Sequence, residues 1–400
     1  MRSHVRPCGS FVAMALLLTI ALASAAFCHL ALALLLVFNK ARTPKLPTPG
    51  LPQAPPKSVL IVVPARNEES NIGDCVRSLL LQDHPALTVR VVDDHSTDRT
   101  GAIVGKLAES DRRLTLVNPP ALPIGWLGKP HAVHHGALGA VADYLLFIDA
   151  DVRLRPTAVS QAMALAESRQ AGLTTLMPEL VASSFWERAT QPVVGLLLYG
   201  LLDPVRTSDP NKADAAGFGP FMLFRRDAYE RVGGHQAVRS EVIEDLKLAQ
   251  LIKQQRLGLC IAHATSLVKL RMYDSLPSII AGWTKNFHVA LGPVRALAPL
   301  FAAILAMVFT LPTVMFWLAI AIGVARGALP DFALLAAVAY GADWLARLAL
   351  YSTYDITPRG LRAVGGLVVA YILCSSVYRA VFGRPVTWRG RSIQAPEAGG

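Results

Sequence analysis

Two long apolar regions flank a central segment of mixed polarity in this chain. The first is an uninterrupted apolar run from Phe11 to Phe38, whose only mildly polar members are Thr19, Ser24 and His29. A helix of roughly 20 apolar residues crosses a bilayer core about 30 Å thick, so this run is long enough to span a membrane. It is also too long for the apolar core of a cleaved signal peptide. We therefore predict a retained transmembrane helix over residues 11–38, after a tail of residues 1–10.

The second apolar region predicts about three transmembrane helices between residues 291 and 383. We place them near Ala296–Val324, Phe332–Tyr351 and Val364–Phe382. Asp343 and Arg347 lie inside the second of these spans, four residues apart on one helical face. Charges at that depth normally pair or face a bundle interior, so we expect an internal ion pair, with a role in acceptor binding as the alternative.

The central segment, residues 58–290, alternates short apolar runs with amphipathic ones. The predicted strands are Ser58–Val63, Thr88–Val92 and Tyr144–Ile148, and the predicted helices are Asn71–Leu81 and Thr100–Glu109. Pro64 is expected to stop the first strand. This alternation predicts a doubly wound parallel sheet, in which ligands bind beyond the carboxyl ends of the strands. The later apolar stretch Phe185–Val205 predicts a helix, either in the core or at the membrane interface.

Composition and charge agree with a membrane protein. Of 400 residues, 53% are hydrophobic and 17% charged, and the net charge is +11. A basic balance can indicate nucleic-acid binding, but here the cations follow the apolar regions, so we expect no nucleic acid. These cations are Lys40, Arg42 and Lys45 after the first span, and Arg384, Arg389 and Arg391 in a basic tail of residues 384–400. The five scattered cysteines form no C-x-x-C pair, which disfavours a disulfide framework or a zinc site.

The basic residues also predict the orientation in the membrane. Lys and Arg mark the cytoplasmic side, so we expect a multi-pass protein of the cell inner membrane whose central domain faces the cytoplasm. Residues 39–57 are Pro-rich, which favours extended backbone and predicts a spacer between membrane and domain. Four spans would place the tail outside, whereas its arginines favour the inside, so one segment could be re-entrant.

Two carboxylates follow the third predicted strand directly. Asp149 and Asp151 are separated only by Ala150, so both can approach one divalent cation from a strand-end turn. Mg²⁺ and Mn²⁺ prefer such oxygen ligands and are often shared with substrate phosphates. Alone, this spacing is more typical of solvated turn residues. Its place after an apolar strand, beside other acidic strand ends, favours a metal site.

The second strand also ends in carboxylates, Asp93 and Asp94. Either could accept hydrogen bonds from a nucleobase imide or a ribose hydroxyl. Either could instead form an Asx turn while Ser96 or Thr97 caps the next helix, and one residue could take each role. After the first strand, Arg66 or Glu68 could face a nucleotide, although a Glu at a helix entry is also ordinary dipole compensation.

A further acidic pair, Glu244 and Asp245, opens an amphipathic helix. Carboxylates there stabilise the helix dipole, which is the simple interpretation. Asp245 is also a candidate general base that could deprotonate an incoming hydroxyl. The preceding stretch Ala213–Gly219 is rich in small residues and would let backbone approach a ligand closely.

In this combination and order, the motifs resemble the membrane-bound family 2 glycosyltransferases of the GT-A fold, over about Ser58 to His288. The resemblance is strongest to the bacterial subgroup associated with hopanoid and carotenoid glycosylation. The supporting stretches are Gly125-Trp-Leu-Gly-Lys129, Ser184-Phe-Trp-Glu-Arg188, Phe224-Arg-Arg-Asp-Ala-Tyr229 with Gly233-Gly234, Arg271-Met-Tyr273, Gly282-Trp-Thr-Lys-Asn286 and Trp388-Arg-Gly-Arg391.

The resemblance implies an α/β fold with a GT-A-type doubly wound mixed sheet between N- and C-terminal transmembrane helices. It also implies site roles. The residues that would hold the nucleotide are Pro64, Ala65, Arg66, Asn67, Glu68, Asp93 and Asp94. Lys129 would lie near the diphosphate, Asp149 and Asp151 would carry Mg²⁺ or Mn²⁺ beside the donor, and Asp245 would be the base.

By the same resemblance, we expect an inverting enzyme that moves a single sugar from a nucleotide-diphosphate donor to a membrane lipid hydroxyl, as in a hopanoid or carotenoid. Processive synthases of this family carry a Q-x-x-R-W motif after the base helix. The corresponding Ala281-Gly-Trp-Thr-Lys-Asn286 lacks it, which favours a single transfer. One alternative is a polyprenyl-phosphate sugar synthase, whose acceptor needs no strong base. Another is a non-catalytic scaffold or a transporter subunit. Transport is disfavoured because the acidic motifs lie outside the spans, and donor hydrolysis would exclude the scaffold.

Overall fold

The computed structural model describes residues 9–47, 56–200, 202–290, 296–354, 362–382, 386–388 and 391–393. Residues 48–55 of the predicted Pro-rich spacer, residues 1–8 of the predicted N-terminal tail, and Arg384 and Arg389 of the basic tail lie outside these ranges. The chain forms two compact units, one of residues 1–38, 182–201 and 274–383, and one of residues 39–181, 202–273 and 384–400. The domain boundaries drawn from the sequence remain predictions.

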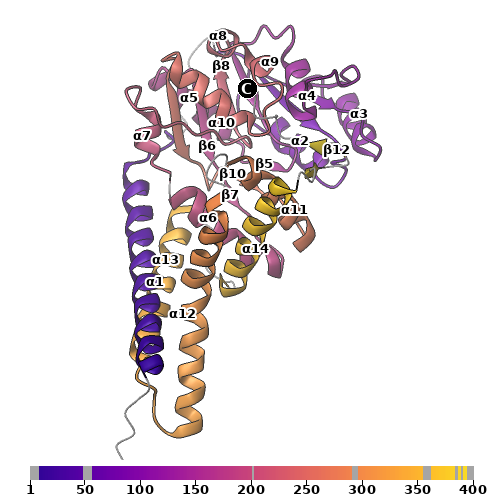
Figure 1. Ribbon diagram of the computed structural model, residues 1–400. Helices are drawn as coiled ribbons and strands as arrows, with labels where there is room; N and C mark the ends of the chain where they lie inside the picture. Colours follow the sequence, from indigo (N-terminus) through magenta and orange to yellow (C-terminus); the bar gives the residue numbers. More distant parts are fainter. Residues whose placement is uncertain are drawn as a thin grey trace, which may run out of the picture. The chain divides into compact units, whose positions relative to one another are not determined.

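A seven-stranded sheet forms the core of the second unit, in the order β3-β2-β1-β4-β8-β6-β9 (Figure 1). Its strands are β1 (Val59–Ala65), β2 (Leu87–Asp93), β3 (Leu114–Val117), β4 (Tyr144–Phe147), β6 (Leu173–Met177), β8 (Met222–Arg225) and β9 (Leu259–His263). Strand β8 runs antiparallel to both β4 and β6, whereas β3, β2, β1 and β4 pair in parallel. The sheet is therefore mixed, and its parallel half aligns the carboxyl ends of β1, β2 and β4.

Helices and a small second sheet complete this unit. The helices are α2 (Ile72–Leu80), α3 (Thr100–Ser110), α4 (Gly128–Ala137), α5 (Ala158–Ser168), α7 (Pro204–Ser208), α8 (Arg226–Arg231), α9 (Gly234–Ala237) and α10 (Glu244–Gln254). The small sheet joins β5 (Val152–Leu154), β10 (Val268–Leu270) and β7 (Glu179–Leu180), and β11 (Val386–Trp388) pairs with β12 (Arg391–Ile393). Helix α2 shows why the pattern works, because its apolar Ile72, Val76 and Leu79 are all buried on one face.

The strands follow the sequence pattern closely, with one correction at Pro64. The sequence analysis ended the first strand before this residue, but β1 continues through Pro64 to Ala65. Strand β4 pairs only with Val59–Val62, so at Pro64 β1 is paired only on the β2 side. A residue without an N–H is tolerated there, as it is at a sheet edge.

Six helices make up the first unit. They are α1 (Gly9–Arg42), α6 (Phe185–Gly200), α11 (Leu276–Ala290), α12 (Ala298–Arg326), α13 (Ala333–Tyr354) and α14 (Arg362–Val381), as far as the described ranges extend. Within those ranges, three helices are long and apolar enough to cross a membrane, at Val12–Arg42, Ala298–Arg326 and Ala333–Ser352. Helix α14 is not among these three, so the predicted span Val364–Phe382 remains a prediction.

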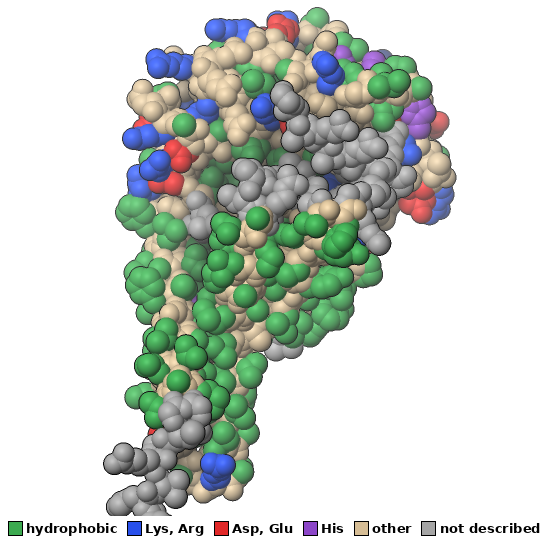
Figure 2. All heavy atoms as spheres, in the orientation of Figure 1, with side chains coloured by type: hydrophobic (Ala, Val, Ile, Leu, Met, Phe, Trp, Pro, Cys, Tyr) green, Lys and Arg blue, Asp and Glu red, His purple; other side chains and the backbone are tan. Residues whose placement is uncertain are grey.

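Apolar side chains cover the outside of these helices (Figure 2). On α1, the side chains of Leu17, Phe27 and Leu34 are each at least two-thirds exposed, at 67%, 72% and 73%. Trp317 on α12 and Leu334 on α13 are exposed as well. A contiguous apolar surface of this kind is unfavourable in water and normally faces lipid or a partner. The three apolar helices therefore indicate membrane association.

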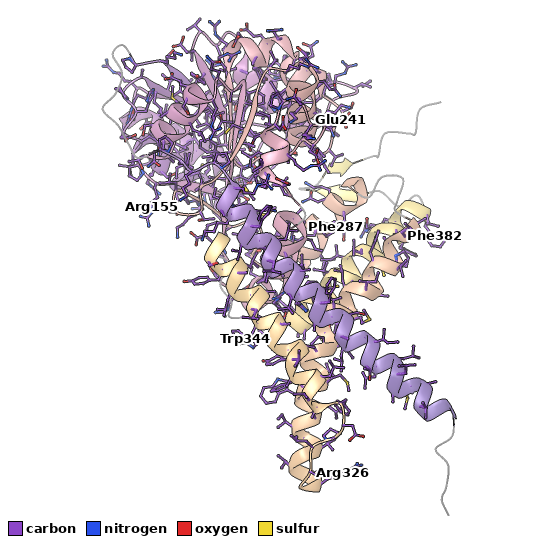
Figure 3. The ribbon with its side chains drawn as sticks, turned by 90° about the vertical axis from the view of Figure 1, so that its left-hand side faces the viewer. Arg155, Glu241, Phe287, Arg326, Trp344 and Phe382 are labelled. Carbon is purple, nitrogen blue, oxygen red and sulfur yellow. The ribbon has the colours of Figure 1, made fainter. Side chains whose placement is uncertain are left out.

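A buried ionic cluster joins three helices inside this unit. The carboxylate of Asp343 lies 2.6 Å from Nη2 of Arg347, which is the ion pair expected from the sequence. Nη1 of Arg362 on α14 and Nε2 of His29 on α1 also reach Asp343, at 3.0 and 3.1 Å. The guanidinium of Arg347 lies over the ring of Trp344, labelled in Figure 3, at 5.0 Å. An unpaired charge would be costly here, so this cluster ties α1, α13 and α14 together.

Candidate active site

Several hydrogen bonds fasten the loop after β1 to the segment after β2. Nη1 of Arg66 donates to the carbonyl of Asp94 at 2.6 Å, and the backbone N–H of Asn67 donates to Oγ of Ser96 at 3.0 Å. The N–H of Glu68 donates to Oγ1 of Thr100 at 2.8 Å. Asn67 takes a left-handed conformation, with φ of 52°, which Asn tolerates better than most residues. The predicted nucleotide-binding residues of β1 thus form one rigid edge with the end of β2.

Asp93 and Asp94 have different surroundings at that edge. Oδ1 of Asp93 accepts the backbone N–H of Ser96 at 3.0 Å, which is the turn role considered from the sequence. Oδ1 of Asp94 lies 3.4 Å from Nδ1 of His95. The backbone N–H of Asp94 donates to the carbonyl of Ala65. Both carboxylates are almost fully buried. Asp93 therefore shapes the turn after β2.

Asp149 and Asp151 follow β4, on the turn that leads into β5. Oδ1 of Asp151 is buried and has no hydrogen-bond partner among the described residues. Burial, and then the nearby carboxylates of Asp149 and Glu68, raise the pKa of Asp151 to about 8. The thiol of Cys75 lies under this turn, 3.7 Å from the carbonyl oxygen of Asp149.

These features fit a divalent cation, because a cation would relieve the repulsion and supply the missing partner of Asp151. No cluster of three or more His, Cys, Asp or Glu able to hold a metal occurs among the residues that the structure describes. Asp149 and Asp151 by themselves would fill only part of a coordination shell. Such sharing is ordinary for Mg²⁺ bound together with substrate phosphates.

Lys129, at the start of α4, links two carboxylates from different elements. Its Nζ lies 2.7 Å from Oδ1 of Asp149 and 2.9 Å from Oε1 of Glu244. Burial by itself would lower the pKa of Lys129, but Asp149, Glu244 and then Asp245 raise it well above its usual value. Lys129 therefore stays charged, and with its side chain 40% exposed it can still meet an anionic ligand.

Asp245 is held by backbone N–H groups at the first turn of α10. Its Oδ2 accepts the N–H of Gly219 at 2.9 Å, and its Oδ1 accepts that of Leu246 at 2.8 Å. Burial, followed by the charge of Glu244, raises the pKa of Asp245 to about 6. This carboxylate is deprotonated near neutral pH and is still basic enough to take a proton.

Gly217 and Gly219 let the backbone before β8 lie close to Asp245. A Cβ on Gly219 would lie 3.1 Å from Oδ2 of Asp245, 3.3 Å from Nζ of Lys129 and 3.6 Å from Oδ2 of Asp149. A Cβ on Gly217 would lie 2.5 Å from the carbonyl oxygen of Asp245. Gly219 is therefore the point where the three charged side chains converge, and a larger residue there would disturb them.

A small pocket opens among these groups. The lining residues that matter for chemistry are Pro64, Lys129, Asp149, Gly219, His235 and Glu244. These residues belong to β1, α4, the end of β4, the loop before β8, α9 and α10. Helices α4 and α9 lie side by side (Figure 1). Of the residues singled out in the sequence, the pocket itself contains Pro64, Lys129 and Asp149, and Asp245 borders it through Gly219.

Two lining residues had no site role in the sequence analysis. Glu244 was interpreted only as a helix-opening residue, and its ion pair with Lys129 depends on bringing α4 to α10. His235 was passed over, although it directly follows the glycine pair that was noted. A histidine after two glycines was the signal that could have identified it.

Comparisons with known proteins identify a family and several relatives. The profile of the family described as "Glycosyl transferase family 2" matches residues 60–233. The 4,4'-diaponeurosporenoate glycosyltransferase of Staphylococcus aureus (strain MRSA252) is 30% identical over 266 residues, which are 64% of this chain and 67% of the relative. The same enzyme from strain USA300 matches with the same identity and coverage.

Two solved structures are also similar. One is the mannosyltransferase PcManGT from Pyrobaculum calidifontis in complex with GDP-Man and Mn²⁺, with 18% identity and a TM-score of 0.46, covering 92% of this chain and 99% of that one. The other is S. aureus TarS 1-349 in complex with UDP-GlcNAc, with 15% identity and a TM-score of 0.38, covering 85% of this chain and 97% of that one.

Proposed function

The chain belongs to glycosyl transferase family 2, and from this we propose that it transfers a single sugar, with inversion, from a nucleotide-diphosphate sugar to a hydroxyl of a membrane lipid. The predicted glycosyltransferase activity and the predicted GT-A-type mixed α/β fold are confirmed by the family match. The activity also excludes the non-catalytic scaffold considered from the sequence. The lipid would be a hopanoid, a carotenoid or another lipid with a free hydroxyl.

The donor would lie across the carboxyl ends of β1, β2 and β4. Asp94 and the loop Pro64–Glu68 would hold the nucleotide, since hydrogen bonds fasten this loop to the end of β2. Lys129 would face the diphosphate, because it is charged, partly exposed and part of the pocket lining. This placement follows the general rule that ligands of open α/β sheets bind beyond the carboxyl ends of the strands.

Asp149 and Asp151 would hold a divalent cation, Mg²⁺ or Mn²⁺, beside the diphosphate. The support is the buried, unpartnered Oδ1 of Asp151 and the repulsion among its acidic neighbours. When bound, such a cation would neutralise negative charge on the leaving diphosphate. The solved structure of PcManGT, a similar protein, contains Mn²⁺ together with GDP-Man.

The observation that carries the proposal is the position of Asp245 at the edge of the pocket that Lys129 and Asp149 line. In a direct displacement, the acceptor oxygen bonds to the anomeric carbon as the bond from that carbon to the diphosphate oxygen breaks. Asp245 takes the hydroxyl proton, and the diphosphate leaves with the electron pair of the broken bond. A base of this strength favours a hydroxyl acceptor over the polyprenyl phosphate of the alternative enzyme, which needs no strong base.

The apolar helices of the first unit are one reason to propose a lipid acceptor. Among the described residues, three helices are apolar enough to span a bilayer, and a relative that is 30% identical is named 4,4'-diaponeurosporenoate glycosyltransferase. Lys40 and Arg42 lie in the last turn of the first of these helices and Lys45 follows it, and these cations favour a cytoplasmic face at that end. We therefore propose a multi-pass protein of the cell inner membrane whose catalytic unit faces the cytoplasm, where nucleotide sugars are made.

Lipid profiling tests this function. Cells with and without the chain are extracted, and their lipids are compared by mass for an increment of one sugar. Purified full-length protein in lipid vesicles is then given UDP-glucose, UDP-N-acetylglucosamine or GDP-mannose with Mn²⁺. We expect one sugar per acceptor and release of the nucleoside diphosphate. Chains of many sugars, or a product only with added polyprenyl phosphate, would contradict the proposal.

A further inference from the structure

His235 lines the pocket but has no part in the mechanism above. It follows Gly233 and Gly234, whose φ values of 79° and 51° are left-handed and favour glycine. A Cβ on Gly234 would lie 2.6 Å from Cζ of Tyr229, so the missing side chain lets the tyrosine ring approach the turn. This Gly-Gly-His turn therefore brings the imidazole of His235 against the hydroxyl of Tyr229.

The hydroxyl of Tyr229 decides where the imidazole carries its proton. It accepts the backbone N–H of His235 at 3.1 Å and lies 2.8 Å from Nδ1 of the same residue. Within the described part of the chain, the structure offers this buried hydroxyl no other acceptor for its own proton. The O–H therefore donates to Nδ1, and the ring proton of His235 is on Nε2.

The imidazole is also uncharged. Burial, and then the positive charge of Lys129, lower the pKa of His235 to about 3. The ring of Phe147 packs edge-on against it, with ring centroids 4.7 Å apart, and keeps its orientation fixed. At any working pH, His235 thus offers the pocket a fixed, neutral N–H donor rather than a cation.

A neutral donor suits a hydroxyl better than a phosphate. Among the polar side chains that line the pocket, Asp149 and Glu244 only accept hydrogen bonds, and Lys129 already pairs with both. A sugar hydroxyl needs an acceptor for its proton and a donor for its oxygen, and a carboxylate together with His235 supplies both. A diphosphate oxygen would instead gain most from Lys129 or a metal ion.

We propose that Nε2–H of His235 donates a hydrogen bond to a hydroxyl oxygen of the donor sugar, and that Tyr229 positions the ring for it. This inference rests on the proposed function. It makes His235 a residue that distinguishes the sugar nucleotide from the bare nucleotide and distinguishes one sugar from another.

The test uses His235→Gln and His235→Met, two side chains of similar length of which only Gln carries an N–H. Full-length wild-type and variant proteins in detergent micelles are titrated with Mn²⁺ and UDP-glucose, UDP-N-acetylglucosamine or GDP-mannose, and separately with UDP or GDP. We expect His235→Met to weaken binding of the sugar nucleotide about threefold to tenfold, the value of one hydrogen bond. Binding of UDP or GDP should change less than twofold, and His235→Gln should recover much of the loss.

An equal loss for the sugar nucleotide and the bare nucleotide would overturn the inference, and so would equal binding by the Met and Gln variants. If either 235 variant fails to fold, Tyr229→Phe replaces it, because it removes only the hydroxyl that fixes the imidazole proton. That variant should weaken sugar-nucleotide binding but spare UDP or GDP, and unchanged binding of both would reject the inference. Failure of the proposed function is distinguishable, since that function is judged from the product that the wild-type protein forms, whereas this inference is judged from the difference in binding between the wild type and its variants.

Discussion

Asp245 has a raised pKa and lies at the edge of the pocket that Lys129 and Asp149 line. Its pKa of about 6 implies that the carboxylate is mostly protonated below pH 6 and cannot act as a base there. We expect the transfer rate to fall about tenfold for each pH unit below that value. Asp245→Asn should lower the rate by about 10²–10⁴ at neutral pH and remove this acidic limb, while donor binding stays near wild type. Initial rates from pH 5 to 8 and donor titrations measure both effects, and loss of nucleotide affinity would assign Asp245 to the donor site.

Asp151 has a buried oxygen without a partner among the described residues, next to other carboxylates. We expect Asp151→Asn to lose activity by orders of magnitude while the protein still folds and inserts, because a metal ligand is removed and the repulsion is relieved. Chelator should inactivate the wild type, and added Mn²⁺ or Mg²⁺ should restore it. Full turnover in excess chelator would rule out the metal site.

Gly219 lies where three charged side chains converge. Gly219→Ala places a Cβ 3.1 Å from Asp245 and 3.3 Å from Lys129, which is closer than carbon normally lies to these atoms. We expect the rate constant of transfer to fall about tenfold with little loss of thermal stability, since small displacements of reacting groups are costly. Gly105→Ala is the matched control, because a Cβ there meets nothing within 4 Å. Equal activity of the two variants would contradict this role of Gly219.

Lys253, near the other end of helix α10, holds the end of α7. The ammonium of this residue donates to the carbonyls of Thr207 at 2.7 Å and of Asp209, at the end of α7 and the start of the loop that leads to Gly219. Lys253→Met should lower the free energy of unfolding by about 1–3 kcal/mol, because these carbonyls lose their donor. Thermal melting compares it with Lys247→Met on the same helix. Equal melting temperatures would show that the ammonium is not needed.

The first residue of α10, Glu244, shows why a pattern of hydrophobic residues predicts helices and strands better than it predicts functional sites. The pattern placed a helix beginning at Glu244, and the structure has it from Glu244 to Gln254. It could not show that Glu244 pairs with Lys129, 115 positions earlier in the printed sequence. Helix formation depends on neighbours in the chain, whereas this ion pair depends on how α4 and α10 pack.

At the level of the molecule, the basic residues at the C-terminal end of α1 predict which side of the membrane holds the catalytic unit. If Lys40, Arg42 and Lys45 are cytoplasmic, protease added to inverted vesicles should cleave the unit, and protease added to intact spheroplasts should not. Immunoblotting of a tagged full-length chain detects the fragments, and a periplasmic marker protein controls for intact spheroplasts. Cleavage in intact spheroplasts would reverse the proposed orientation.

The sequence by itself determined the elements and the class of chemistry. Continuous apolar runs such as Val59–Val63 can only be buried, and a run from Phe11 to Phe38 is long enough to span a bilayer, so both could be recognised without a structure. Carboxylates at strand ends, Asp149 and Asp151 among them, indicated where a ligand would bind because parallel strands align their ends.

Tertiary structure alone decided which polar groups meet. It gave the carboxylate of Asp93 a turn N–H to accept, placed Lys129 between two carboxylates, and brought the imidazole of His235 to the hydroxyl of Tyr229. It also added His29 and Arg362 to the expected ion pair of Asp343. The physical reason is that burial and periodicity are properties of local sequence, whereas hydrogen bonds and ion pairs form between side chains that only packing brings within about 3 Å of one another.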